Sequence, residues 1–430
     1  MVAKRIDHIV KRPGRIQGEP DVSIPVSGDL VTEPGIRANE PDVDFYSRKY
    51  PIEDMSVTLT ADAEWSFLES SAEDQEAFRR TYRLLSPIVK AGHESGDIEP
   101  TNEPNPGQDV TQLIIDKARE LGFSEVGFTR YDRRYTYKDK KRWVKYEHAI
   151  CLALEQDYER TQTIPSAYAE DAALYAYGTM SQLGLILADY IRSLGYHAQV
   201  HGPMDTVEVI IPMFVAAGLG QLGANGQLLS PHFGSRARLM TLTTDAIVTY
   251  NEPVDYGIHE FCQVCQVCVN RCPGRALQRE KVWWRGIEKN KLVYERCRPV
   301  MARFSSCGVC MKVCPIQKYG MVSVMEHYVQ TGDILGKGTY ELEGYELEGK
   351  GYYGPDELPH FDRGFFDLPH GKSEDVLFEE FKKKLTSREI PEGPSGDADL
   401  RLFREQVEKA VLKNEGSANP MAMVLPDEEE

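Results

Sequence analysis

Eight cysteines between residues 262 and 314 limit the fold of this chain more than any other feature of its sequence. The stretch FCQVCQVCVNRCPGRAL, residues 261–277, places four of them at C-x2-C-x2-C-x3-C-P spacing. In the bacterial ferredoxin pattern, the first three such cysteines ligate one [4Fe-4S] cluster and the fourth ligates a second cluster. The spacing therefore predicts that a second set of cysteines follows.

The second set occupies residues 297–314 and ends in C-x2-C-x3-C-P spacing. Eight thiolates in this order predict two [4Fe-4S] clusters with interleaved ligands, close enough to pass electrons between them. Structural zinc sites also use C-x2-C pairs, but they do not require three cysteines at C-x2-C-x2-C spacing followed by x3-C-P. The first cluster would be held by Cys262, Cys265, Cys268 and Cys314, and the second by Cys272, Cys297, Cys307 and Cys310.

The ninth cysteine, Cys151, lies in the apolar stretch AICLAL, where we expect an inert thiol in a buried strand. The other eight fall in units that are typical of metal ligands in a reducing compartment. No run of 18 apolar residues is present, so we expect no transmembrane segment. The basic N-terminal residues show neither a Sec nor a twin-arginine signal, and we therefore expect a cytoplasmic protein.

The charge of the chain bears on its partners. It has 50 Lys and Arg residues against 67 Asp and Glu residues, a formal net charge of -17. Such a surface repels a nucleic-acid backbone unless a local basic patch intervenes. Nucleic acid is therefore disfavoured as a partner.

Hydrophobic patterning predicts an α/β layer domain before the cysteines. A helix should begin at Asp109 and stop at Gly122, and a second should run from about Ser166 to Leu194 with Tyr177 on its apolar face. Strands are expected at SEVGFTR, AICLAL, HAQV, VEVII and RLMTLTTDAIVTY. We divide the chain into an extended N-terminal arm (1–105), an α/β domain (106–255), a ferredoxin-like iron–sulfur domain (256–320) and a C-terminal extension with an acidic tail (321–430).

Two further motifs carry weaker signals. GLGQLG at 218–223 matches G-x-G-x-x-G, but it leads into the loop-like ANGQLLSPHFGSR instead of a helix, so a dinucleotide site is disfavoured. We expect these glycines to serve close backbone packing or a cofactor cradle. The extension holds a tandem repeat, YELEG at 340–344 and 345–349, and two copies are too few for a solenoid.

Residues 110–320 resemble the reductive dehalogenases. The shared features are a helix with an inward Tyr177 that ends in Leu-Gly-Tyr, the segment GLGQLGANGQLLSPHFGSRARL, and the ferredoxin block with Trp283 and Trp284 between its halves. The resemblance implies an α+β protein in which a nitroreductase-like α/β domain binds a corrinoid (cobalamin) base-off, beside a bacterial ferredoxin-like domain with two [4Fe-4S] clusters. The absence of a D-x-H-x-x-G motif agrees with a cobalt that takes no protein His from below.

The resemblance also implies which residues act. Tyr177 corresponds to the proton-donating tyrosine of the family, and Arg236 to the basic residue that faces it, with Arg238 as the competitor for this role. A cation beside a phenol favours the phenolate and makes the hydroxyl a better acid. Contacts to the corrinoid are expected from the glycine-rich segment, namely Gly218, Gly220, Gly223, Gly226, Ser230 and Gly234.

In the reaction that the resemblance implies, the clusters pass electrons to cobalt and hydrogen replaces a halogen of an organohalide. An external ferredoxin or flavodoxin-type protein would donate the electrons. We expect neither the Tat leader nor the fused C-terminal reductase that some members of the family carry. The sequence also has no counterpart of the family Asn expected close to Met204 and Asp205. The sequence leaves open the organohalide, the lower base of the corrinoid, the physiological donor and the oligomeric state.

Three alternatives differ in class. Epoxyqueuosine reductases combine the same corrinoid domain with paired clusters but use an Asp as proton donor, where this chain has Tyr177, and a charge of -17 is unfavourable for tRNA. A ferredoxin-type electron carrier would not need the long patterned domain before the cysteines. A corrinoid protein that catalyses another reduction, or that reactivates corrinoids, is also compatible with the sequence.

Overall fold

The computed structural model describes residues 5–10, 22–27, 85–136, 140, 142–203, 207–284 and 287–366. Most of the predicted N-terminal arm and the end of the C-terminal extension lie outside these ranges. Within the arm, β1 (Arg5–Val10) and β2 (Val22–Ser27) pair as an antiparallel hairpin, and β2 contacts α12 (Met321–Thr331). Residues 85–94 are helical, and the short η3 (Ser95–Asp97) follows them.

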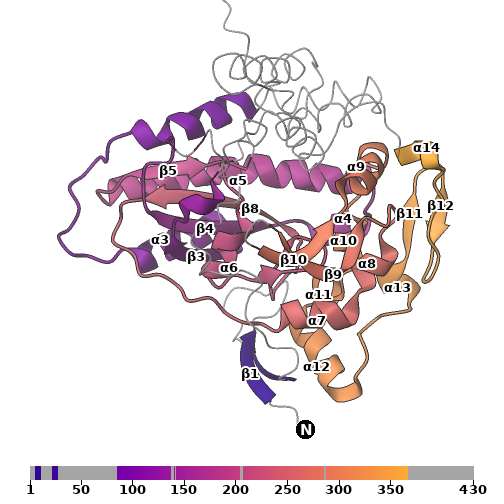
Figure 1. The fold of residues 1–430 in the computed structure, drawn as a ribbon. Coiled ribbons are helices and arrows are strands. Elements are labelled where there is room, and N and C mark those ends of the chain that lie inside the picture. The colour runs from indigo at the N-terminus through magenta and orange to yellow at the C-terminus, as the bar shows by residue number, and fades with distance from the viewer. Residues whose placement is uncertain are drawn as a thin grey trace, which may run out of the picture.

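A four-stranded antiparallel sheet forms the centre of the α/β domain (Figure 1). Its strand order is β3 (Glu125–Arg130), β4 (His148–Glu155), β8 (Ala237–Thr244) and β5 (Ala198–His201). Side chains alternate between the faces of a strand, so β4 sends Ile150 and Leu152 to one side and Cys151 to the other. Both faces of the sheet are apolar, and both need cover.

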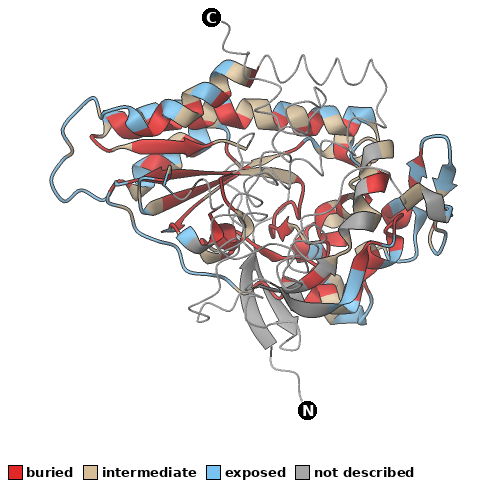
Figure 2. Ribbon diagram, turned by 45° about the horizontal axis from the view of Figure 1, so that its top comes forward, coloured by how far each residue is buried: buried red, intermediate tan, exposed pale blue. Residues whose placement is uncertain are grey.

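Helices provide this cover. α3 (Thr111–Leu121) and α5 (Ala167–Ser193) pack on the face of Ile150, and α6 (Ile211–Ala216) packs on the face of Cys151. Figure 2 shows buried residues along the sheet and along one side of α5. Cys151 is fully buried, and burial raises the pKa of its thiol, as expected for an inert core cysteine.

The predicted helix ends lie within two residues of the observed ones: α3 begins at Thr111 after the N-cap residue Val110, and α5 begins at Ala167 after Ser166. Asp109 accepts a hydrogen bond from the Thr111 N–H at 2.8 Å, and Gly122 ends α3 with a φ of 102°. Ser166 caps α5 by accepting from the Ala169 N–H at 3.1 Å. These caps satisfy backbone groups that the first and last turns of a helix leave without partners. Local sequence therefore sets where both helices begin and end.

The strand predicted at VEVII is wrong. Glu208 forms only an isolated bridge with Thr136, and Ile211 begins α6 with Pro212 in its first turn. Proline fits a first helical turn because no intrahelical donor is needed there, and it cannot donate to a sheet. The last predicted strand also ends early, since β8 stops at Thr244.

The glycine-rich segment follows α6 and forms a short hairpin of β6 (Gln221–Leu222) and β7 (Leu228–Leu229) before it leads into β8. A dinucleotide fold would instead place a strand before the glycines and a helix after them. The arrangement agrees with the prediction that this segment does not bind a dinucleotide in the Rossmann manner.

Short helices and a hairpin make up the cysteine domain, which Figure 1 shows beside the sheet. Its elements are α7 (Ile258–Cys265), α8 (Val267–Arg271), β9 (Leu277–Trp284), β10 (Ile287–Leu292), α9 (Tyr294–Arg303), α10 (Val309–Lys312) and α11 (Pro315–Tyr319). The extension continues with α12, α13 (Tyr340–Glu343), β11 (Tyr345–Leu347), β12 (Gly351–Tyr353) and α14 (Arg363–Phe366).

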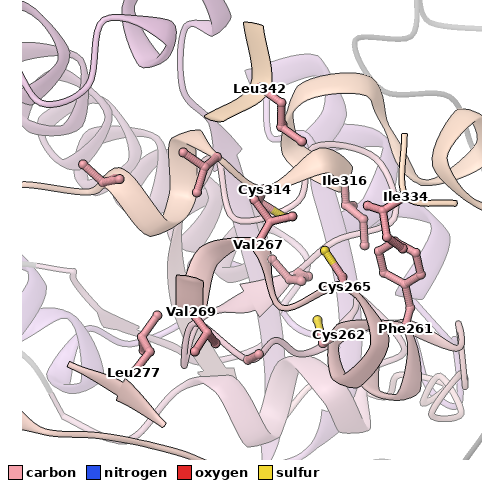
Figure 3. Close-up of a cluster of buried hydrophobic side chains, with 14 of the residues drawn as sticks. Phe261, Cys262, Cys265, Val267, Val269, Leu277, Cys314, Ile316, Ile334 and Leu342 are labelled. Atoms are coloured by element: carbon pink, nitrogen blue, oxygen red, sulfur yellow. The ribbon is translucent and has the colours of Figure 1, made fainter. Parts of the chain in front are cut away.

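One hydrophobic core joins the cysteine domain to the extension. Val267 and Ile316 of the cysteine domain pack in the same core as Ile334 and Leu342 of the extension (Figure 3). The core therefore continues across residue 320, the predicted boundary between the cysteine domain and the extension. In the described part of the chain, no helix is both long and apolar enough to cross a membrane.

Candidate active site

The first cysteine group surrounds a small cavity of about 20 Å³ beside the glycine-rich hairpin. Cys262 and Cys265 come from α7, Cys268 comes from α8, and Cys314 directly precedes α11. Figure 3 shows the sulfurs of Cys262, Cys265 and Cys314 around one space. Leu229 of the hairpin lines the same cavity, so this cysteine group lies against the glycine-rich segment.

The second group brings Cys272, Cys297, Cys307 and Cys310 together. Burial raises the pKa of Cys307 to about 12, and the charges of Cys297 and Cys272 add to this rise. Burial also raises the pKa of Cys310, and its charged neighbours are Cys307, Cys272, Cys297 and then Cys314. The two groups are therefore adjacent, and their assignment to two clusters stays a prediction.

Backbone N–H groups point at sulfurs of both groups. The N–H of Ala276 donates to Cys272 Sγ at 3.3 Å, the N–H of Val309 donates to Cys307, and two more reach Cys314. Such bonds favour thiolates and tune iron–sulfur sites, and a buried thiol is ionised when it coordinates a metal. The residues therefore fit the predicted [4Fe-4S] clusters. Among described residues, no three His, Cys, Asp or Glu side chains converge closely enough to hold a single metal ion.

A larger cavity of about 270 Å³ lies between α5, the sheet and the segment that follows the glycine-rich hairpin. Tyr177 of α5 and Arg238 of β8 line it, together with Phe233, Gly234 and Ser235 of the connecting segment. The predicted catalytic tyrosine therefore borders a space that is large enough for a small molecule.

The cation that faces Tyr177 is Arg238. Its guanidinium carbon lies 4.7 Å from the centre of the Tyr177 ring, in a cation–π contact. Side chains alternate along β8, so Arg238 shares the face covered by α5 with Met240. Arg236 lies before the strand, in a turn closed by the hydrogen bond from its N–H to the Phe233 carbonyl. Because β8 begins at Ala237, Arg238 lies within the strand and reaches Tyr177, whereas Arg236 lies outside it.

Arg236 is directed elsewhere, and this corrects the predicted pair of Tyr177 and Arg236. Its buried side chain pairs with Glu155 at 2.5 Å and donates to the Gln156 carbonyl at 2.8 Å. Its guanidinium lies over the ring of Tyr158, 5.1 Å from the ring centre. Arg236 thus ties the end of β4 to the start of β8, and of the two arginines only Arg238 lines the cavity.

A buried polar network that was not predicted from the sequence also borders this cavity. His201 Nδ1 lies 2.9 Å from Glu208 Oε2, and these side chains are only 2% and 3% exposed. The Tyr131 hydroxyl donates to Glu208 at 3.3 Å, and His201 Nε2 lies 3.1 Å from the Thr243 hydroxyl. Burial raises the pKa of Tyr131, and the Glu208 charge adds to the rise. The signal that could have revealed the network is a glutamate inside the apolar run VEVII.

Several buried polar atoms around the larger cavity have no hydrogen-bond partner among the described residues. They include Ser235 Oγ and Arg238 Nε on its wall. Both side-chain amide atoms of Gln317 in α11 are also buried without a partner in the described part of the chain, and the backbone of this residue lies behind the wall, against Gly234. Unpaired buried polar atoms are costly, so they indicate a polar ligand. A corrinoid carries amide groups around its ring, and these atoms fit such groups. A corrin ring is larger than the cavity, so these residues would hold one part of it.

The predicted cradle glycines differ in their surroundings. A Cβ added at Gly220 would meet the Leu229 carbonyl, so the packing of the hairpin itself requires a glycine there. Gly226 has no neighbour within 4 Å of an added Cβ. Gly234 lines the larger cavity, and an added Cβ would lie 2.8 Å from the backbone of Gln317. Gly234 is thus the predicted contact that borders the cavity.

The other predicted contacts serve the local fold. Added Cβ atoms at Gly218 and Gly223 would lie 2.6 Å from the Glu252 carbonyl and 2.7 Å from the Leu229 side chain. Ser230 is buried, and its hydroxyl accepts from the His232 N–H at 3.1 Å. These residues shape the segment that carries Gly234 and Ser235 to the cavity.

No family model matches the chain, but reductive dehalogenases are among the proteins that it resembles. A tetrachloroethene reductive dehalogenase of Desulfitobacterium hafniense is 28% identical over 219 residues, which cover 40% of this chain and 39% of the relative. The enzyme of that name from Sulfurospirillum multivorans is 29% identical over 181 residues, which cover 40% of this chain and 36% of the relative. The chain thus spans about two-fifths of the length of these curated relatives.

A match of another kind covers less of the chain. An epoxyqueuosine reductase of Lactococcus garvieae is 30% identical over 149 residues, which cover 31% of this chain and 39% of the relative.

Solved structures share the fold. A catabolic reductive dehalogenase in complex with 3-bromo-4-hydroxybenzoic acid has a TM-score of 0.55 at 21% identity, over 84% of this chain and 54% of its own. Another reductive dehalogenase structure, which suggests a mechanism for B12-dependent dehalogenation, has a TM-score of 0.55 at 20% identity. This match also covers 84% of this chain and 54% of the other.

Proposed function

We propose that this chain, which is related to the reductive dehalogenases, uses a corrinoid and two [4Fe-4S] clusters to replace a halogen of an organohalide by hydrogen. The net reaction consumes two electrons and one proton, since R–X + 2e⁻ + H⁺ gives R–H + X⁻. The B12 dependence described for a structural neighbour supports the corrinoid. The spacing of eight cysteines supports the clusters.

The observation that carries the proposal is the order of the parts in space. The second cysteine group adjoins the first, and the first shares a small cavity with Leu229 of the glycine-rich hairpin. The segment after this hairpin lines the larger cavity together with Tyr177 and Arg238. A route for electrons thus ends beside a pocket with a few convergent polar groups, which is typical of a small-molecule site.

The cofactor would be held through the unpaired polar atoms around the cavity. When bound, a corrinoid supplies the metal chemistry that accepts electrons and breaks a carbon–halogen bond. We assign Ser235, Arg238 and Gln317 to its polar groups, because their buried atoms have no other hydrogen-bond partner among the described residues. We propose base-off binding, since the sequence carries no D-x-H-x-x-G motif.

Tyr177 is the proposed proton donor. Its half-buried ring borders the cavity, and the guanidinium of Arg238 lies over it. Burial makes a phenolate unfavourable, and a cation beside the ring offsets this cost. Arg238 thus takes the role that was predicted for Arg236. This arrangement favours proton delivery from Tyr177 to the carbon that loses the halide.

The remaining parts of the proposal concern partners. We propose that an external ferredoxin or flavodoxin-type protein supplies the electrons, because the cysteine groups offer a route into the molecule. We further propose a cytoplasmic location and a small organohalide as substrate, with no nucleic acid as partner.

Anaerobic purification with cofactor reconstitution tests the proposed function. We expect about eight iron atoms and one corrinoid per chain. We also expect halide release from 3-bromo-4-hydroxybenzoate or tetrachloroethene, compounds named for similar proteins. Bound zinc, or only about four iron atoms, would contradict the two clusters. Turnover of tRNA that contains epoxyqueuosine, with no halide release from either compound, would favour the epoxyqueuosine reductase alternative.

A further inference from the structure

The two YELEG copies place their tyrosines in opposite environments. The first copy forms α13 and leaves Tyr340 63% exposed, whereas the second forms β11 and leaves Tyr345 only 1% exposed. Leu342 and Leu347, the central leucines of the two copies, are both fully buried. The copies therefore share an anchor in the core, but only the second also buries its aromatic ring.

Tyr345 lies among ligands of the second cysteine group. Arg271, the residue before Cys272, places its guanidinium carbon 4.9 Å from the centre of the Tyr345 ring. The ring belongs to the core that contains Cys272, and Cys307 packs against this core. Burial raises the pKa of Tyr345, Arg271 opposes this rise, and Cys307 and Cys272 add to it. The tyrosine thus shares a core and an electrostatic interaction with two of the four predicted ligands.

The Tyr345 hydroxyl has no hydrogen-bond partner among the described residues. Arg271 offers no acceptor, and its N–H groups donate to the carbonyls of Glu343, Tyr353 and Glu357. A buried O–H without an acceptor is unfavourable. An acceptor is therefore expected from a group that this site binds, and the thiolate and sulfide sulfurs of a cluster are such acceptors.

We propose that the Tyr345 hydroxyl donates a hydrogen bond to a sulfur of the cluster held by Cys272, Cys297, Cys307 and Cys310. This inference rests on the cofactor part of the proposed function and adds a residue that sets a reduction potential. A donor to sulfur stabilises the more negative, reduced cluster. Tyr345 thereby makes the second cluster easier to reduce, while the first cluster is unaffected.

Redox titration of the reconstituted full chain, followed by electron paramagnetic resonance, tests the proposal. Tyr345→Phe should lower the equilibrium constant for reducing the second cluster by roughly threefold to tenfold, the usual size of one lost hydrogen bond. Tenfold corresponds to about 59 mV for one electron. The second-cluster signal is identified as the one that Cys272→Ser alters. Tyr340→Phe is the matched control, since it makes the same change in the exposed copy of the repeat, and it should leave both potentials unchanged.

The outcomes separate this proposal from the proposed function. An unchanged second-cluster potential in Tyr345→Phe, with the full iron content, would overturn the role of Tyr345 and leave the clusters in place. Absence of both clusters from the unaltered chain would overturn both. A fluorinated tyrosine at position 345 covers the case in which Tyr345→Phe loses iron, because it keeps the hydroxyl and is a stronger donor. It should raise the second-cluster potential, and a fall or no change would count against the proposal.

Discussion

Tyr177 and Arg238 meet because the helical repeat of α5 and the alternation of β8 direct both side chains to the same cavity. Tyr177→Phe removes only the hydroxyl and preserves the ring. We expect turnover to fall by roughly 10²-fold or more, the usual size of a lost general acid, with unchanged iron and corrinoid contents. The measurement is the dehalogenation rate per bound corrinoid. A rate near that of the unaltered chain would show that Tyr177 is only a core residue.

Substitutions of Arg238 and Arg236 should have different effects on the dehalogenation rate. Arg238→Leu should lower turnover in the direction of Tyr177→Phe, and the double variant should be little worse than either single variant, because residues that act as a unit are not additive. Arg236→Leu should chiefly reduce stability, since it leaves Glu155 without its buried partner. If Arg236→Leu instead lowers turnover without loss of stability, then Arg236, and not Arg238, is the cation that assists Tyr177.

His197 makes stability depend on pH. Burial lowers its pKa, but hydrogen bonds and charges of Asp245 and Glu99 outweigh this effect and raise it overall. The stabilisation is therefore fully present below the unfolded pKa of about 6.5 and is lost as pH rises through the higher folded value. His197→Gln should lose more free energy of unfolding at about pH 6 than at about pH 9. Urea denaturation at both values checks this, and equal losses would contradict it.

Between elements, the proposed function requires each cysteine loop to supply one ligand to the cluster of the other loop. Cys272 follows α8 in chain order but belongs with Cys307 and Cys310 of the later loop. Cys272→Ser should therefore damage the second cluster and leave the first with its full set of ligands. Iron analysis with electron paramagnetic resonance distinguishes the two signals. Cys151→Ser, a change in a buried thiol of β4, is the control and should leave the iron content unchanged.

Spacing and capping residues predicted some elements well. The two cysteine groups follow from spacing alone, and Asp109 and Ser166 mark helix starts through hydrogen bonds made within a few residues. The prediction that Arg236 faces Tyr177 is wrong, because β8 begins after Arg236 and presents Arg238 to that ring. His201, at the end of β5, pairs with Glu208 in the wall of the cavity, and the local signal for this pair is only the glutamate within VEVII.

The YELEG repeat shows most directly how context overrides local sequence. The first copy follows Thr339, whose hydroxyl accepts from the Leu342 N–H at 3.3 Å and caps a helical turn. The second copy pairs Tyr345 with Tyr353 of β12 and becomes a strand. The same five-residue sequence thus contains a four-residue helix in one copy and a three-residue strand in the other, because the cap and the strand partner differ.

Across the whole molecule, the separate hydrophobic cores predict that iron removal destabilises the cysteine domain more than the sheet domain. The sheet and its helices form cores of their own, whereas the cysteines share a core with α12, α13 and β11. Anaerobic chelation should therefore speed hydrogen exchange in residues 258–347 and leave β4 and β8 nearly unchanged. Hydrogen–deuterium exchange with mass spectrometry measures both regions at once. A uniform rise across the chain would show that the cores unfold together.

The contact between Gly234 and Gln317 limits how this protein can be recombined. A Cβ at residue 234 would lie 2.8 Å from the backbone of Gln317, so the cavity wall and α11 fit together with no room for a larger side chain. A chimera that joins the sheet domain of one relative to the cysteine domain of another would cut through this contact. Functional hybrids should therefore inherit residues 230–238 and 314–317 from the same parent.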